Sequence, residues 1–438
     1  MTRMKVAVAT LGCKVNQYES AGIMEALRMR GFSLVPFGDP ADFYIVNTCT
    51  VTGKTDYQSR QLIRRATRNN PDAAVIVTGC YAQTAPEDVA CIPGVALVAG
   101  TSEKEDIPDL LGETFPGAHR VLVGDIFTVR RISPLEAKTF PGHTRGFLKI
   151  QDGCNAFCSY CIVPYARGQS KSLPEGEIMR RLGTLAAAGY REIVLTGIHL
   201  GAYGQDLTPP TSLLRVLENS EKNEAVERLR LSSLEPTEIH DDLLAFLRKA
   251  NHICHHLHIP LQSGDSRILS LMKRDYDAEF FRDLLEKIVR AVPDIAIGID
   301  VMVGFPGERE KEFFNTLRLI EELPIAYLHV FPYSERPGTA AASLPGKVGE
   351  REKKKRGEML RNLGKKKKEL FAEQFKGKEL SVLIESRKDR KTGCLQGFSG
   401  NYLPLAVADT TREHINRIVS VVPEEYRDGK LFGRIVHD

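Results

Sequence analysis

Three closely spaced cysteines could hold a metal centre. Cys154, Cys158 and Cys161 follow a C-x3-C-x2-C pattern, and Tyr160 precedes the last of them. Soft thiolates bind iron–sulfur clusters or zinc. A structural zinc site would need a fourth cysteine or histidine nearby, and the next such residue downstream is His199. The pattern therefore favours a cubane iron–sulfur cluster that is held by three cysteines and leaves one iron open.

An open iron would give this cluster a specific chemistry. It can chelate the amino and carboxylate groups of the methionine part of S-adenosylmethionine. Electron transfer from the cluster then splits the sulfonium and yields a 5′-deoxyadenosyl radical. Cofactors carry radical chemistry of this kind, while the protein positions and shields them. Zinc or a purely structural site is the alternative interpretation of the motif.

Cys13, Cys49 and Cys80 form a second set that could bind metal. Each follows a predicted strand, at residues 5–10, 43–47 and 74–78, and helices are predicted at 18–30, 56–68 and 86–90, with a further strand at 95–99. Strands that alternate with helices form parallel βαβ units, and ligands bind such sheets beyond the carboxyl ends of the strands. The three thiols can therefore converge although 36 and 31 residues separate them.

The other cysteines and a group of histidines carry weaker signals. An odd count of nine cysteines argues against a disulfide framework, and Cys91, Cys254 and Cys394 have no assigned role. Four histidines lie close together, at positions 252, 255, 256 and 258. Along a strand His256 and His258 share one face. A metal site is possible there, but a core or cofactor-facing role is favoured.

The central region repeats a strand and a helix after a linker at 116–144 that contains scattered proline and glycine. The predicted strands are 147–151, 192–196, 229–232, 257–260, 296–303 and 327–331. Amphipathic helices are predicted at 175–188, 239–249, 279–292 and 308–322. Repeated βα units of this kind suggest a barrel or partial barrel, whose chemistry lies at the carboxyl ends of its strands.

The last part of the chain has a different pattern. Short strands are predicted at 379–385, 403–408, 416–422 and 431–436, with glycines between them. Evenly spaced short strands without helices suggest a small β-barrel. A basic run at 351–368, with ten lysines or arginines and two glutamates, precedes it. Such a run is either a solvated helix face or a surface for an anionic partner.

Bulk properties place the chain among ordinary globular proteins. Its 438 residues suffice for two or three domains, and 42% of them are apolar and 26% charged. A net charge of +4 gives only weak support for an anionic partner. The first residues contain no signal-peptide core, and no apolar stretch of about 20 residues could span a bilayer. We therefore expect a cytoplasmic protein without a membrane partner.

The cysteine motifs resemble those of a known family. The C-x3-C-x2-C loop, with its aromatic residue and preceding strand, resembles the radical S-adenosylmethionine superfamily. Leu-Gly-Cys-Lys-Val-Asn-Gln-Tyr-Glu at 11–19 resembles the signature of the methylthiotransferases that act on N6-threonylcarbamoyladenosine in tRNA. The subgroups for isopentenyladenosine and for a ribosomal protein carry other residues after the first cysteine. Asn-Thr-Cys-Thr-Val-Thr at 47–52 and Thr-Gly-Cys-Tyr at 78–81 resemble the other cluster loops.

The resemblance covers nearly the whole chain and implies an α/β fold in three parts. These are an N-terminal methylthiotransferase domain at 3–115, a radical S-adenosylmethionine core with a partial (β/α)6 barrel at 140–370, and a TRAM RNA-binding β-barrel at 373–438. It also implies two [4Fe-4S] clusters with catalytic roles. The radical cluster lies on Cys154, Cys158 and Cys161, and the auxiliary cluster, also with an open iron, on Cys13, Cys49 and Cys80.

The implied reaction is methylthiolation of carbon 2 of N6-threonylcarbamoyladenosine beside the anticodon. That carbon carries an unactivated C–H bond, so a radical can abstract its hydrogen where acid–base chemistry cannot. A cluster with a free coordination site can hold the incoming sulfur. The resemblance implies that one S-adenosylmethionine methylates this sulfur and a second generates the radical.

Contacts to S-adenosylmethionine are implied at several strand ends, where glycines permit close approach of a ligand. The implied positions are Tyr160 near the adenine, Thr196, Gly197, Ser233, Glu235, Gln262 and Gly304. A turn or capping role is the alternative for each.

RNA contacts are expected on the small barrel and the basic run. Phe398 and Tyr402 are candidates for stacking on bases, and packing inside the protein is the alternative for both. Lys171 stands in a loop where relatives often carry arginine, and it lacks bidentate phosphate geometry.

The partners follow from the same resemblance. The substrate is tRNA, and the electron donor is a protein such as a flavodoxin or ferredoxin; the sequence does not indicate the sulfur donor.

Two alternative functions remain open. The chain could methylthiolate another modified adenosine or a ribosomal protein, or it could be a non-catalytic RNA-binding protein with structural iron–sulfur clusters.

Iron content tests the presence of two cysteine sites. Anaerobically reconstituted protein should bind about eight iron atoms, because each cubane cluster contains four. Iron is measured by a colorimetric assay against protein concentration. Four or fewer irons per chain would contradict the second site.

Overall fold

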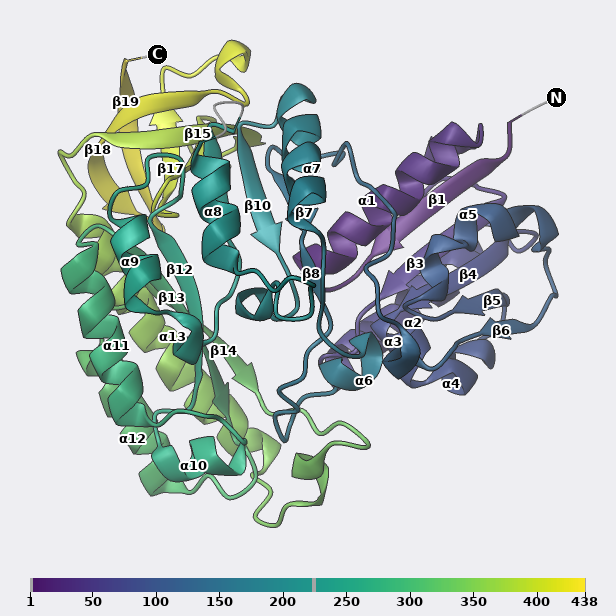
Figure 1. The fold of residues 1–438 in the computed structure, drawn as a ribbon, viewed down its shortest axis with the longest axis horizontal. Helices are drawn as coiled ribbons and strands as arrows, with labels where there is room; N and C mark the ends of the chain where they lie inside the picture. Colours follow the sequence, from purple (N-terminus) through teal and green to yellow (C-terminus); the bar gives the residue numbers. More distant parts are fainter. Residues whose placement is uncertain (1–2, 223–225, 438) are drawn as a thin grey trace.

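The computed structural model describes residues 3–222 and 226–437. It contains an N-terminal α/β unit, a central partial barrel and a C-terminal β-barrel, coloured purple, teal to green, and yellow in Figure 1. In the described part of the chain, no helix is both long and apolar enough to cross a membrane.

The N-terminal unit is built on a parallel sheet of six strands in the order β2-β1-β3-β4-β5-β6. The strands are β1 (Lys5–Thr10), β2 (Ser33–Val35), β3 (Phe43–Thr48), β4 (Ala74–Gly79), β5 (Val95–Ala99) and β6 (Arg120–Leu122). Every residue of β3 and β4 is buried, as expected for central parallel strands with helices on both faces. The edge strands β2 and β6 were not predicted, and β6 lies in the segment interpreted as a linker.

Helices begin close to each cysteine of this unit. The helices are α1 (Lys14–Met29), α2 (Gly53–Asn69), α3 (Cys80–Thr84), α4 (Pro86–Ala90) and α5 (Ile107–Leu110). Cys13 is the N-cap residue of α1, which therefore begins four residues before the predicted start. Thr52, three residues after Cys49, caps α2 by accepting a hydrogen bond from the Thr55 amide. Cys80 is the first residue of the unpredicted helix α3.

The central unit is a partial barrel of six parallel strands, as predicted. The strands are β7 (Gly146–Lys149), β10 (Glu192–Thr196), β11 (Arg228–Leu231), β12 (His256–Gln262), β13 (Ala296–Val303) and β14 (Tyr327–Pro332). Two three-stranded sheets, β11-β10-β7 and β12-β13-β14, meet through bridges from Leu229 to Ile253 and from Ser233 to His258. The barrel is open between β7 and β14, and the short pair β8 (Gln151–Asp152) and β9 (Lys171–Ser172) follows β7.

Helices cover the outside of this barrel (Figure 1). Helix α6 (Val163–Arg167) lies instead beside α3 of the N-terminal unit. The covering helices are α7 (Glu175–Ala187), α8 (Leu213–Glu221), α9 (Asp241–Leu247), α10 (Ser266–Leu271), α11 (Ala278–Ala291), α12 (Glu310–Glu322) and α13 (Glu350–Glu373). Their apolar stripes pack with the strands in one hydrophobic core. The basic run forms α13, but two of its cations, Lys353 and Arg356, are buried and pair with Glu350 and Glu308.

The C-terminal unit is a closed barrel of five strands in the order β15-β16-β17-β19-β18. The strands are β15 (Leu380–Lys388), β16 (Leu395–Ser399), β17 (Pro404–Ala408), β18 (Ile418–Arg427) and β19 (Lys430–His437). The sequence analysis missed β16, which contains Gly397. A side chain at that position would lie 2.5 Å from the Leu383 carbonyl oxygen, so the close approach of β15 requires the glycine that weakened the strand pattern.

The C-terminal barrel is docked on the amino ends of the central strands, away from their carboxyl ends (Figure 1). Arg230 at the start of β11 pairs with buried Glu192 at 2.6 Å and donates to the Ser399 and Gly400 carbonyls. Arg228 donates to the Ser381 carbonyl at 3.0 Å. Because both arginines are buried, these bonds fix the position of the C-terminal barrel.

Phe398 and Tyr402, the candidates for RNA stacking, lie in this interface. Their rings stack with centroids 5.1 Å apart. Arg145 lies over the Phe398 ring at 4.8 Å, Arg230 lies over the Tyr402 ring at 4.8 Å, and His256 contacts Tyr402. Both aromatic residues therefore pack against the central unit, in agreement with the packing alternative. They stay partly exposed, and stacking on RNA stays a prediction.

Replacing Arg230 with Ala should destabilise the protein by about 3–5 kcal/mol, because the buried Glu192 carboxylate loses its closest partner. The free energy of unfolding is measured by urea denaturation followed by circular dichroism. Arg191→Ala is the control: its ion pair with Glu227 is about half exposed, so its loss should cost less than about 1 kcal/mol. Equal losses in the free energy of unfolding from the two substitutions would contradict the role of Arg230 in holding the C-terminal barrel.

Candidate active site

The first cysteine loop is closed by glycine-dependent backbone contacts. It follows β8, and the Cys154 amide donates to the Gly168 carbonyl at 3.0 Å. Gly153 and Gly168 have φ angles of 78° and 71°, a region that favours glycine. A side chain at Gly153 would lie 2.0 Å from the Gln169 carbonyl oxygen. The loop of cysteines is thus held against the end of α6.

Polar side chains contact two thiols of this loop. Arg274 donates to Cys158 Sγ at 3.3 Å and pairs with Glu235. His199 Nδ1 lies 3.4 Å from Cys154 Sγ, and its Nε2 lies 2.7 Å from Glu238. The two charged pairs orient the loop from outside, as groups around a metal ligand commonly do.

The first set suits a soft, positively charged metal centre. Burial, together with the neighbouring Cys158 and Cys154 thiols, raises the pKa of Cys161 to about 12. Three adjacent thiolates would repel one another without a cation to compensate them. Iron of a [4Fe-4S] cluster matches both the donor type and the number of donors.

The structure brings the second set together from three separate loops. Cys13, Cys49 and Cys80 lie at the carboxyl ends of β1, β3 and β4. The loops of the first two cysteines are in contact, because a side chain at Gly12 would lie 3.0 Å from Cys49 Sγ. Burial, followed by the Cys80 and Cys13 thiols, raises the pKa of Cys49 to about 11. Cys13 is exposed while the other two are buried, so the set opens on one side.

The residues expected to contact S-adenosylmethionine all lie at the carboxyl end of the central barrel, on the same side as the first loop. They are Tyr160 after β8, Thr196 and Gly197 at β10, Ser233 and Glu235 after β11, Gln262 at β12 and Gly304 after β13. The Gly304 amide donates to Glu308 at 2.9 Å, with φ of 74°. The Glu235 carboxylate is held by Arg274. Their contact with the cofactor remains a prediction.

A polar group lines the interior of the barrel between β12, β13 and β14. His258 Nε2 and His329 Nδ1 lie 3.0 and 3.3 Å from one carboxylate oxygen of Asp300. His256 and His258 share a strand face, as predicted, since both contact the Tyr327 hydroxyl. These donors come from three strands, and one ligand atom from each lies within 4.8 Å of the other two.

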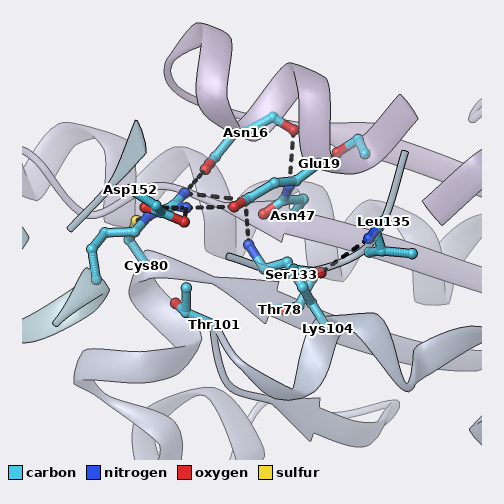
Figure 2. A network of polar contacts seen from close by, with 12 residues as sticks. Asn16, Glu19, Asn47, Thr78, Cys80, Thr101, Lys104, Ser133, Leu135 and Asp152 are labelled. Atoms are coloured by element: carbon cyan, nitrogen blue, oxygen red, sulfur yellow. Dashed lines mark hydrogen bonds and ion pairs between the residues drawn. The ribbon is translucent and has the colours of Figure 1, made fainter. Parts of the chain in front are cut away.

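A buried charge cluster joins the N-terminal and central units (Figure 2). Glu19 of α1 pairs with Lys104, with Lys149 at 2.8 Å and with Arg167 at 2.6 Å. Asp152 pairs with Lys149 at 3.0 Å and with Arg167 at 3.4 Å. Burial alone would raise the pKa of Glu19, but Arg167, Lys104 and Lys149 together hold it well below its usual value.

No local pattern in the sequence indicates this cluster, because 148 residues separate Glu19 from Arg167. The sequence left a role of Lys171 in RNA contact in doubt. Lys171 is buried and donates to the Arg167 carbonyl at 2.7 Å, which agrees with that doubt.

A cavity of about 650 Å³ lies between the N-terminal unit and the edge strand β14. Its lining includes Thr52 and Lys54 from the Cys49 loop and Phe331, Tyr333 and Lys347 from the central unit. Tyr333 also packs against Phe305, whose ring contacts Tyr160 of the first cysteine loop. The cavity thus begins three residues after Cys49, is linked to the first cysteine loop through the Tyr333 and Phe305 rings, and combines aromatic surface with lysines.

Comparison with known proteins gives matches over almost the whole chain. Residues 5–100 match a family described as "Uncharacterized protein family UPF0004", and residues 148–320 match the radical SAM superfamily. The chain is 40% identical to the threonylcarbamoyladenosine tRNA methylthiotransferase MtaB of Bacillus subtilis, over 99% of this chain and 97% of that protein. It is 41% identical to the MtaB protein of Aquifex aeolicus, over 87% and 93%.

More distant relatives differ in their named substrate. The tRNA-2-methylthio-N(6)-dimethylallyladenosine synthase of Pelotomaculum thermopropionicum is 32% identical over 95% of this chain and 98% of its own length. Among solved structures, the radical S-adenosylmethionine methyltransferase TsrM of Kitasatospora setae superposes with a TM-score of 0.59 at 16% identity, over 78% and 77% of the two chains. That structural likeness concerns the fold alone.

Glu19→Gln should destabilise the protein by about 3–5 kcal/mol, because buried Lys104 loses its carboxylate partner. Since the pKa of Glu19 is lowered on folding, its stabilisation is present above the unfolded-state value and disappears as pH falls through the folded one. Urea denaturation at several pH values measures both effects. Glu25→Gln, which removes a more exposed pair with Arg28, is the control and should cost less than about 1 kcal/mol.

Proposed function

The chain belongs to the threonylcarbamoyladenosine tRNA methylthiotransferase family, and from this premise we propose that its two cysteine sites perform two parts of one reaction. The enzyme methylthiolates carbon 2 of N6-threonylcarbamoyladenosine in tRNA, with S-adenosylmethionine and two [4Fe-4S] clusters. The observation that carries the division of labour is the convergence of two separate cysteine trios on either side of one domain interface.

We assign the radical site to Cys154, Cys158 and Cys161 and the auxiliary site to Cys13, Cys49 and Cys80. When bound, the two clusters supply the electron that cleaves S-adenosylmethionine and an iron that can hold sulfur. The protein supplies orientation. Arg274 and His199 hold the first loop through its thiols, and the helix starts at Cys13 and Cys80 fix the second.

S-adenosylmethionine is proposed to lie across the carboxyl ends of the central strands. The contacting residues would be Tyr160, Thr196, Gly197, Ser233, Glu235, Gln262 and Gly304. One physical feature supports this placement. Arg274 pairs with the Glu235 carboxylate and holds it just beyond the carboxyl end of β11, where it can accept hydrogen bonds from an amino or hydroxyl group.

The tRNA is proposed to reach the cavity beside Cys49 and to follow the basic helix α13. That helix begins near Tyr333, where Lys353 donates to the Tyr333 carbonyl, and ends in the hydrophobic core of the C-terminal barrel. Its exposed cations could neutralise phosphates along the way. They are Arg351, Lys354, Lys355, Arg361, Lys365 and Lys366.

The domains and partners follow from the same proposal. Residues 3–115 would hold the auxiliary cluster, 140–370 would generate the radical, and 373–438 would bind RNA as a TRAM domain. A tRNA substrate implies work in the cytoplasm, and a flavodoxin or ferredoxin would supply electrons. The relatives that modify dimethylallyladenosine are less similar to this chain, which favours threonylcarbamoyladenosine as the substrate.

Mass spectrometry of tRNA nucleosides tests the reaction. A strain that lacks this gene and any second such enzyme should lose the methylthio form of threonylcarbamoyladenosine and regain it from the intact gene. Persistence of the methylthio nucleoside in the deletion strain would contradict the proposed substrate.

Cysteine variants in the same assay test the division of labour. Purified Cys158→Ala protein should form neither 5′-deoxyadenosine nor product, whereas Cys49→Ala should retain part of the cleavage and form no product. Cys91→Ala, at an exposed cysteine outside both sites, is the matched control and should form product normally. Equal loss of cleavage in the Cys158 and Cys49 variants would argue against separate roles.

A further inference from the structure

Arg167 lies between the two cysteine sites and is linked to both. It is the last residue of α6, six residues after Cys161. The next residue, Gly168, accepts the hydrogen bond from the Cys154 amide that closes the first loop. The Arg167 side chain runs the other way, across the domain interface, and is fully buried. Gly168 thus contacts the first cysteine loop, and the adjacent Arg167 points towards the second cysteine set.

The Arg167 guanidinium contacts the second site directly. Its Nε donates to Cys80 Sγ at 3.4 Å. Its Nη2 donates to the Asn16 side-chain oxygen, and Asn16 in turn donates to the carbonyls of Leu11 at 2.7 Å and Thr48 at 2.9 Å. Those carbonyls belong to the loops of Cys13 and Cys49. One guanidinium therefore braces all three cysteine loops, one of them through a thiol.

The charge around Arg167 is not neutral. Three buried cations, Arg167, Lys104 and Lys149, share two buried carboxylates, Glu19 and Asp152. Lys171, also buried beside Arg167, adds a further cation. Glu103, Glu105 and Asp106 line a pocket beside this cluster, but among the described residues only Glu19 and Asp152 pair with the buried Arg167 guanidinium. A buried guanidinium whose Nε faces a thiol favours an anion at that thiol. A cubane cluster bound by three thiolates is such an anion, and Cys80 is the point at which the charge cluster touches it.

The radical site has a corresponding arrangement within one domain. Arg274 donates to Cys158 Sγ and pairs with Glu235. In both sites an arginine donates to one thiol while a carboxylate holds the guanidinium. The difference is that Arg167 reaches its thiol from another domain, 87 residues away in sequence, so the auxiliary site is complete only when the two domains are docked.

We infer that Arg167 is a positioning residue that fixes the auxiliary cysteine loops against the radical site and raises the reduction potential of the auxiliary cluster. The inference rests on the proposed assignment of that cluster to Cys13, Cys49 and Cys80. Reduction adds negative charge to a cluster, and hydrogen bonds to its sulfurs together with nearby positive charge stabilise the reduced form. Weak solvent screening at this buried position makes the effect larger than at a surface.

Redox titration of the auxiliary cluster alone tests the inference. The full chain carrying Cys154→Ala, Cys158→Ala and Cys161→Ala should still bind about four irons after reconstitution. Arg167→Lys and Arg167→Gln are added to this chain, and the midpoint potential is followed by electron paramagnetic resonance. Both should shift the midpoint to lower potential. The glutamine variant should shift it further, because lysine keeps the charge and loses only the guanidinium geometry.

Arg181→Lys is the matched control. Arg181 is a buried arginine of the central unit that crosses the same interface and donates to the Tyr18 hydroxyl at 2.7 Å, without contacting a cysteine. Its substitution should leave the midpoint unchanged. Loss of iron from the Arg167 variants alone would also support the positioning role.

Two results would overturn the inference. One is an unchanged midpoint in both Arg167 variants with about four irons bound. The other is an equal shift, or an equal loss of iron, in the Arg181 variant. Failure of the starting chain to bind any iron while Arg167 is intact would instead contradict the proposed cluster assignment itself, and the inference with it.

Discussion

The interface between the first two domains depends on charges that are buried and must stay paired. Glu19, Lys104, Lys149, Asp152 and Arg167 have side chains that are at most 5% exposed. Removing charges from water is costly and is offset only when the pairs keep good geometry. A small shift of one domain against the other would break several pairs at once. The two cysteine sites, which lie on opposite sides of this interface, therefore keep a fixed relation.

The central barrel separates two tasks along its strands. Its carboxyl ends carry the radical loop and the residues proposed for S-adenosylmethionine, and its amino ends are covered by the C-terminal barrel through Arg228 and Arg230. The basic helix α13 runs between these ends, from Tyr333 to the C-terminal barrel. In the proposed function, a large RNA contacts both ends of the enzyme along this path, and one base enters the cavity beside Thr52 and Tyr333.

Much of the fold could be predicted because apolar patterning is local. The six central strands and the cysteines at the ends of β1, β3 and β4 followed from periodicity alone. The missed elements have physical reasons. Helix α3 is only one turn long and starts at Cys80, β6 is a three-residue edge strand, and β16 depends on Gly397, which lowers strand propensity while permitting the sheet to close.

The sequence by itself determined which residues can do the chemistry, because the type of each ligand and its spacing along the chain do not depend on the tertiary structure. Cys154, Cys158 and Cys161 lie on one loop, and this spacing limits what they can bind. Only the tertiary structure decided what surrounds the ligands. The contact of Arg167 with Cys80 and the packing of Phe398 and Tyr402 against the central unit join residues far apart in the chain. Burial and charge pairing act through space, so no local pattern encodes them.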